Sequence, residues 1–444
     1  MPDANPPSPP ATLRGRAVFV LVLLFALYIL AAVDRQILAV MVDPIRERFA
    51  LSDTQLGVLS GSAFALVYAF AAFPAARLAD RHSRTTLIAC GLALWSLCTG
   101  LFAFARSWWQ LLLCRMGLGL GEACLGPMAV SLLADYFPAR NLGKAMSVYI
   151  LAVPLGNGLT GLLGGAMLDG ALVAPATTGS WLDALQPWQL LLLLLGAAGF
   201  ALLLLFVLFV PEPARTRDAM DRAPDYSLHA FARHLATHIG VYAALAAVML
   251  TSALMYFGVG YWIPSHFTRN AAAGGLAAAE LLYYWGLIAS VAGALGVIAG
   301  GFLADHLNAR HADGLWRTLA AGTVLLGIGF TLFSFFGSQQ LELLLLVPGV
   351  FGNGILQAAG LTAVAKLTPA HMRGQVAALY FLLVNLVGAG LGPVLIAWLG
   401  ESVFTGPAGL RVAMAVTAGA MSVASLLALA RSAAAVRRLQ EGSI

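Results

Sequence analysis

The chain has 444 residues, of which 60% are hydrophobic and only 10% are charged, and its formal net charge is +5. Soluble domains carry about 25% charged residues, so this composition excludes an ordinary soluble globular protein. The positive balance does not indicate a nucleic-acid partner, because Lys and Arg follow the charge distribution of a membrane protein.

Apolar residues recur in stretches of about 20, the length that a helix needs to cross a bilayer. The sequence therefore predicts an all-α membrane protein. Its twelve predicted transmembrane helices are residues 17–42, 54–79, 85–105, 108–133, 143–168, 188–210, 238–265, 278–303, 316–337, 341–364, 374–400 and 410–431.

Lys and Arg in the connecting loops orient these helices. Of the 25 Lys and Arg residues, 18 fall on the side of the N-terminus, 5 on the other side and 2 inside helices. Because basic loops stay in the cytoplasm, both termini are predicted to be cytoplasmic. Residues 1–16 are proline-rich and are expected to form a disordered N-terminus, and residues 432–444 form the tail.

The chain contains one internal repeat. Two pairs of segments match at offsets of 225 and 231: ARLADRHSR (76–84) with GFLADHLNAR (301–310), and PARNLGKA (138–145) with PAHMRGQV (369–376). Two independent matches at nearly one offset predict two pseudo-symmetric six-helix bundles, at residues 17–210 and 238–431.

Residues 211–237 connect the two predicted bundles. The segment opens with PEPARTRDAMDRAP, which is too polar to span a membrane. Further on, Leu228, Phe231 and Leu235 share one helical face. We predict a cytoplasmic linker with an amphipathic helix that either lies on the inner membrane surface or docks loosely as part of a solvated loop.

Six-helix bundles repeated in parallel are typical of secondary transporters, which bind substrate near the midplane and alternate access by rocking. The sequence has no GxxxxGK[ST] phosphate loop, so ATP is not the predicted energy source. It also has no nucleophile–base pair and no metal-ligand spacing. The chain is therefore not predicted to be an enzyme or to hold a metal.

The segment ARLADRHSR after the second helix resembles a motif of the major facilitator superfamily, Gly-x-x-x-Asp-Arg-x-Gly-Arg. It keeps Asp80, Arg81 and Arg84, with alanine and serine at the two glycine positions. The resemblance implies the major facilitator fold and a cytoplasmic gate, in which Asp80 contacts the opposite bundle in one state. Asp305 is the matching residue of the second copy. The alternative is ordinary loop charges that obey the orientation rule.

Three further segments are similar to the Spinster-like branch of that superfamily: AAVDRQILAV in helix 1, RMGLGLGEA in helix 4 and DYFPAR after it. The resemblance implies a proton-driven carrier, with lysolipids or sphingosine phosphates as substrates in animal members, and most relatives act as monomers. Asp-Arg in the first helix also occurs in organic-anion symporters, so it is less specific than the glycine-rich motif.

Four charged side chains lie inside predicted helices 1 and 4, at Asp34, Arg35, Arg115 and Glu122. Such charges are costly in a membrane and are functional by default. At 1.5 Å per residue, Asp34 and Arg115 lie roughly 10–12 Å below the outer surface, so they can pair if the two helices are neighbours. Arg35 is rotated about 100° from Asp34 and is expected to face the cavity or a polar neighbour.

Glu122 lies two turns beyond Arg115 on the same helix face, about 10 Å deeper. The sequence offers no cation at that depth, and a buried carboxyl group without a partner favours its protonated form. We predict Glu122 as the principal protonation site and Asp34, held ionised by Arg115 in one state, as the second. The alternative is a static network that only fixes helix packing.

The second bundle carries no charged residue in the central turns of its helices, and the offset of 231 places Asn353 opposite Glu122. Arg35 is the predicted site for an anionic head group. The other predicted substrate-binding residues are Asn353, Gln357, Asn385, Tyr256 and Tyr380. A charged bundle that faces an apolar one predicts a cavity for an amphipathic molecule. Alternatively, Gln357 and Asn385 only bond helix to helix.

We therefore predict a proton-coupled transporter of lipid-like amphipathic substrates that works by alternating access, with protons as the coupling ion and no cofactor. Symport of small organic anions such as sugar acids, and multidrug efflux, are the alternatives. The expected partners are substrate and membrane lipids, and the expected state is a monomer. The richness in Arg and Ala favours the cytoplasmic (inner) membrane of a bacterium.

Overall fold

The computed structural model describes residues 11–171, 184–213, 228–271, 275–336, 338–368 and 382–441, together with residues 372, 376, 379 and 380. Within these residues, twelve helices are long and apolar enough to cross a membrane. The predicted all-α fold with twelve spans is confirmed.

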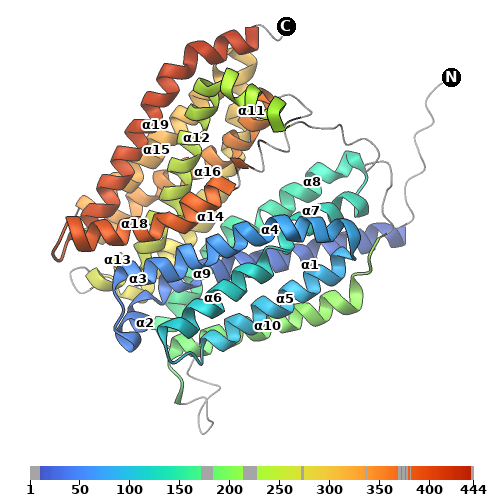
Figure 1. Ribbon diagram of the computed structural model, residues 1–444. Helices are drawn as coiled ribbons and strands as arrows, with labels where there is room; N and C mark the ends of the chain where they lie inside the picture. The colour runs from blue at the N-terminus through green and yellow to red at the C-terminus, as the bar shows by residue number, and fades with distance from the viewer. Residues whose placement is uncertain are drawn as a thin grey trace.

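The first six spans form one bundle, drawn in blue to green in Figure 1. Its elements are α1 (Ala11–Gln36), η1 (Ile37–Val40), α2 (Val42–Phe49), α3 (Asp53–Gly57), η2 (Val58–Ser62), α4 (Ala63–Arg81), α5 (Arg84–Phe102), α6 (Trp108–Glu122), α7 (Leu125–Tyr136), α8 (Ala139–Ile150), α9 (Ala152–Leu168) and α10 (Pro187–Phe209). Helix α2 occupies the stretch that the sequence analysis treats as the first loop.

The last six spans form the second bundle, drawn in green to red. Its elements are α12 (Ile239–Ala253), η5 (Leu254–Val259), α13 (Gly260–Asn270), α14 (Ala278–Arg310), α15 (Gly314–Leu332), η7 (Phe333–Phe335), α16 (Gln339–Leu367), η8 (Val384–Leu391), α18 (Gly392–Trp398), η9 (Leu399–Val403) and α19 (Gly409–Glu441). Helix α11 (Leu228–Thr237) precedes it, so the described end of the linker is helical.

Several spans are interrupted by wider turns. The elements η2, η5 and η8 are π-helical segments inside spans 2, 7 and 11. The fourth span, which the sequence predicts as one helix over 108–133, is broken between Glu122 and Leu125. Such interruptions are frequent at functional sites, and this one directly follows a buried carboxyl group.

The glycine run of the fourth span allows α6 to approach two neighbours. A Cβ at Gly121 would lie 2.5 Å from the carbonyl oxygen of Gly91 in α5, and a Cβ at Gly119 would lie 2.8 Å from the carbonyl oxygen of Phe64 in α4. Any larger residue would push the helices apart. The close packing fixes the position of α6, which carries Arg115 and Glu122, against α4 and α5.

The two bundles meet at one end and diverge at the other (Figure 1). They converge around α2, α3 and α13, and they splay apart towards the side on which both chain termini lie. We call these the closed side and the terminal side. The molecule is therefore drawn in a conformation that is open towards its termini.

Glycines also bring the bundles together along two contacts. A Cβ at Gly161 of α9 would lie 2.6 Å from the Cα of Gly286 in α14. On the other flank, a Cβ at Gly57 would lie 2.9 Å from the carbonyl oxygen of Pro393. Backbones in such close contact can rock against each other without long side chains to disengage.

Charged groups seal the closed side. Arg269 of α13 donates to Asp43 of α2 through Nε at 2.9 Å, and to both carboxylate oxygens of Asp53 at 2.7 Å. Glu401 accepts hydrogen bonds from the backbone N–H groups of Asp53 at 2.6 Å and Thr54 at 3.1 Å, which caps the start of α3. All of these contacts cross between bundles, so opening this side requires breaking them.

We predict that Arg269→Gln favours opening of the closed side. Hydrogen bonds to charged groups are worth about 1.5–3 kcal/mol, so the open population should rise by about tenfold or more. Spin labels at Glu47→Cys and Ser402→Cys, with the four native cysteines replaced, would report a longer distance between the bundles.

Arg317→Gln is the matched control, because Arg317 pairs with Asp313 within one bundle. It should leave the distance distribution unchanged. An unchanged distribution in Arg269→Gln would show that the ion pairs do not hold this side shut.

Candidate functional site

Arg35 and Glu122 form an ion pair at the ends of α1 and α6. The Nε atom of Arg35 donates to Oε2 of Glu122 at 2.6 Å. The Glu122 side chain is fully buried, whereas that of Arg35 is 22% exposed. The prediction that Glu122 has no cation of its own is wrong. Helices 1 and 4 pack closely enough for the long Arg35 side chain to reach down to the deeper residue.

Arg115 bonds to backbone rather than to the Asp34 carboxylate. Its guanidinium donates to the carbonyl oxygens of Asp34 and Arg35 at 2.8 Å each, and to that of Ser60 at 3.2 Å. The predicted Asp34–Arg115 ion pair is therefore absent from this conformation. Helix α1 ends at Gln36, so carbonyl groups near its end lack helical partners, and Arg115 satisfies them.

Asp34 is the buried carboxyl group left without a hydrogen bond. Its side chain is almost completely enclosed, and neither carboxylate oxygen has a partner within the described residues. The indole of Trp95 lies close enough to interact with it, but its N–H is likewise unpaired. Asp34 and Arg115 line one small internal cavity together with Thr99. In the structure Glu122 is therefore the paired carboxyl group and Asp34 is the lone one, which is the reverse of the prediction.

Aromatic rings flank both arginines. The Phe64 ring lies 5.4 Å from the guanidinium carbons of both Arg35 and Arg115, and the Tyr68 ring lies 5.0 Å from that of Arg35. Cation–π contacts of this kind contribute about 0.5–2 kcal/mol. They hold the charges in place where water is scarce.

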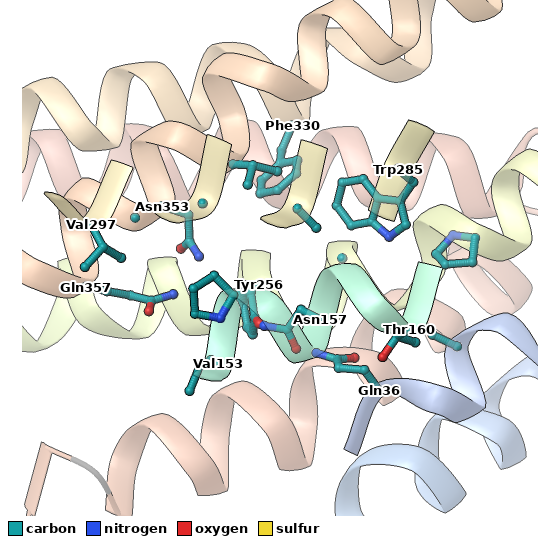
Figure 2. Close-up of a pocket in the computed structure, with 18 of the residues that line it drawn as sticks. Gln36, Val153, Asn157, Thr160, Tyr256, Trp285, Val297, Phe330, Asn353 and Gln357 are labelled. Atoms are coloured by element: carbon teal, nitrogen blue, oxygen red, sulfur yellow. The ribbon is translucent and has the colours of Figure 1, made fainter. Parts of the chain in front are cut away.

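A second feature is a cavity between the bundles, which we call the central cavity (Figure 2). Its polar lining residues come from both bundles and are Gln36, Asn157, Thr160, Tyr256, Asn353 and Gln357. Apolar and aromatic residues, among them Val153, Trp285 and Phe330, form the rest of the wall.

The structure brings together some of the predicted substrate residues and not others. Tyr256, Asn353 and Gln357 line the central cavity, whereas Tyr380, Asn385 and Arg35 do not. Tyr380 and Asn385 have other interaction partners. Those two come from span 11, and no residue of that span is among the described residues that line the cavity.

Sequence reasoning missed Gln36, Asn157 and Trp285, which all line the cavity. Gln36 directly follows the Asp-Arg pair, and Asn157 lies in a glycine-rich helix. Polar residues among glycines on one helix face were the available signal.

The residues predicted to form a gate lie on the terminal side. Arg84 donates hydrogen bonds to Asp135 at 2.5 Å and to Glu212 at 2.8 Å. Arg84 and Asp135 belong to the first bundle, and Glu212 lies just after its last helix. Burial opposes ionisation of Glu212, but hydrogen bonds from the Thr85 N–H, Arg84 and Ser83 hold its pKa below the usual value. The start of the linker is thereby fastened to α5.

Of the remaining predicted gate residues, Asp305 has a described side chain, and its ion pair stays within one bundle. Asp305 pairs with Lys366 at 3.2 Å, and both belong to the second bundle. The side chains of Asp80 and Arg81 lie outside the described part of the structure. The two bundles are apart on this side, so a gate contact between them belongs to another conformation.

No cluster of His, Cys, Asp and Glu within the described residues could hold a metal ion. The polar groups that the described site presents are the ion pair, the lone carboxyl group and the amides of the central cavity.

Two known proteins have sequences similar to that of this chain. The chain is 28% identical over 374 residues to an MFS-type efflux pump of Mycolicibacterium smegmatis, covering 83% of this chain and 81% of the pump. It is 29% identical over 329 residues to protein spinster homolog 1 of Homo sapiens, covering 70% of this chain. That alignment spans 59% of the human protein, less than two thirds of its length.

The fold has solved counterparts. A crystal structure of a bacterial homologue of the human lysosomal transporter Spinster, inward-facing and unoccupied, matches with a TM-score of 0.76 at 24% identity, covering 96% of this chain and 97% of that one. The family model of the Major Facilitator Superfamily matches residues 24–393. This chain is an integral membrane protein and belongs to the Major Facilitator Superfamily of transporters.

Proposed function

We propose that the protein couples proton movement to transport of amphipathic, lipid-like anions by alternating access. The observation that supports this proposal most is the Arg35–Glu122 pair, in which a fully buried carboxylate holds a partly exposed arginine. A protonated Glu122 carries no charge and releases Arg35 to an anion. A bound anion in turn favours the proton on Glu122, because both compete for the same guanidinium.

Asp34 is the proposed second protonation site. A buried carboxylate without a partner pays the full cost of desolvation, so its neutral form is favoured until water or a cation reaches it. Arg115 acts as a positioning residue, since it holds the backbone of Asp34 and Arg35. The proposed gate on the terminal side consists of Asp80, Arg81, Arg84 and Asp305.

The terminal side is the proposed cytoplasmic side, because 18 of the 25 Lys and Arg lie there and basic loops stay inside. In the cytoplasmic membrane of a bacterium, the present conformation is then open to the cell interior. Rocking about the glycine contacts would close it and break the Arg269 ion pairs. No cofactor takes part, and the protein acts as a monomer.

The mostly apolar wall of the central cavity favours a substrate with a hydrocarbon part. Proton-coupled symport of small organic anions is the second candidate. It is favoured by the polar side chains that both bundles contribute to the cavity. Efflux of apolar drugs would need no arginine at the site.

Glu122→Gln should abolish coupling while leaving the fold intact. In liposomes, accumulation of labelled lauroyl lysophosphatidate driven by a pH gradient should fall to equilibration, because glutamine cannot exchange a proton. Exchange of substrate across the membrane without a gradient should continue.

Glu280→Gln is the control for this test, since Glu280 is exposed and only caps α14 through the Ala277 N–H. Uphill accumulation by Glu122→Gln at the wild-type rate would refute the assignment.

Arg35→Gln should weaken binding of lauroyl lysophosphatidate by about tenfold to a hundredfold, because a charged hydrogen bond is worth about 1.5–3 kcal/mol. Uncharged lauroyl glycerol should bind with unchanged affinity. Titration calorimetry of both ligands checks the difference, with the exposed Arg106→Gln as control. Unchanged affinity for the anion would remove Arg35 from the binding site.

A further inference from the structure

The central cavity contains polar groups that the fold itself does not use. The side-chain amides of Asn157 and Gln357 are partly exposed and make no hydrogen bond within the described residues. The Tyr256 hydroxyl is buried and also lacks a partner, although Gln36 approaches it. Side chains that pack helices together by hydrogen bonding would have a protein partner, whereas these groups keep their donors and acceptors available to a ligand.

These groups converge from opposite walls. Asn157 comes from α9 of the first bundle, while Asn353 and Gln357 lie one turn apart on α16 of the second (Figure 2). Asn353 is almost fully buried, and its oxygen accepts from Ser252 at 2.5 Å. That bond orients the amide and leaves its N–H donors available.

The lining also excludes charged ligand groups. None of the described residues around the central cavity is Asp, Glu, Lys, Arg or His. A charged group placed there would lose its hydration without an opposite charge to replace it. A purely apolar group would leave the amides unpaired. An uncharged group that both donates and accepts matches the amides and the tyrosine.

The size of the cavity points to a small group. Its volume is about 60 Å³, and one buried water needs about 10–15 Å³ on this measure. The cavity thus has room for more than one water-sized group, and a small unit such as glycerol fits within it. The indole of Trp285 adds an apolar wall for the carbon atoms.

We propose that the central cavity binds an uncharged hydroxylated group of glycerol size, with Asn157, Tyr256, Asn353 and Gln357 as its hydrogen-bond partners. This inference rests on the proposed transport function, since it assigns a chemical class to part of the transported molecule. The group belongs either to the head of an amphiphile or to a small free polyol. In both cases an attached anion would lie towards Arg35, which adjoins Gln36 in the chain.

The test uses full-length protein in nanodiscs of diacyl phosphatidylcholine, which has no free hydroxyl group. Titration calorimetry compares 1-O-dodecylglycerol, its di-O-methyl ether and free glycerol. Because the ether lacks both O–H donors and each hydrogen bond contributes about 0.5–1.5 kcal/mol, the diol should bind at least about fivefold more tightly than the ether. Preference for the diol would identify an amphiphile, and binding of glycerol alone would identify a free polyol.

Two near-isosteric variants, Asn157→Leu and Gln357→Met, should each reduce the preference for the diol to less than about threefold, or reduce binding of glycerol by a similar factor. Affinity for the ether should stay the same, which shows that the fold is intact. Gln340→Met is the matched control, because Gln340 is exposed and far from the cavity lining.

Equal binding of diol and ether together with no binding of glycerol would overturn the proposal. So would a preference that both variants retain. Dodecylglycerol carries no charge, so its binding does not depend on Arg35 or Glu122. Failure here is therefore distinct from failure of proton coupling, which the Glu122→Gln transport assay measures.

Discussion

The hydrogen bonds from Arg115 to the end of α1 are the constraint on which the site depends. No water is available in a membrane interior to satisfy free carbonyl groups, and α1 changes to a 3₁₀ turn just beyond Gln36. Arg115 supplies the missing donors for residues 34 and 35. It thereby holds the helix end in one orientation.

That orientation sends three successive side chains to three environments, because each residue turns the helix by about 100°. Asp34 faces the interior of the first bundle, Arg35 reaches Glu122, and Gln36 faces the central cavity. The lone carboxyl group, the ion pair and the polar lining of the central cavity are thus connected through the end of α1. In the proposed mechanism, a change in protonation at one of them acts on the others through a single helix end.

The contact between the bundles also depends on a few residues. Small residues at Gly161 and Gly286 allow backbone contact, while Arg269 adds directional ion pairs on the closed side only. Close packing without interlocking side chains permits rotation, and the ion pairs bias it. The proposed alternating access would then exchange one closed side for the other without unfolding either bundle.

The sequence by itself determined the membrane class, the twelve spans and the presence of buried charges, because length, hydropathy and charge cost act locally along the chain. It also pointed to Tyr256, Asn353 and Gln357 as cavity residues. Only the tertiary structure decided which charges pair. Arg35 rather than Arg115 holds a carboxylate, since pairing depends on the rotation and separation of α1 and α6. Rotation and separation both arise from packing among the other helices of the bundle, which no periodicity in one helix can reveal.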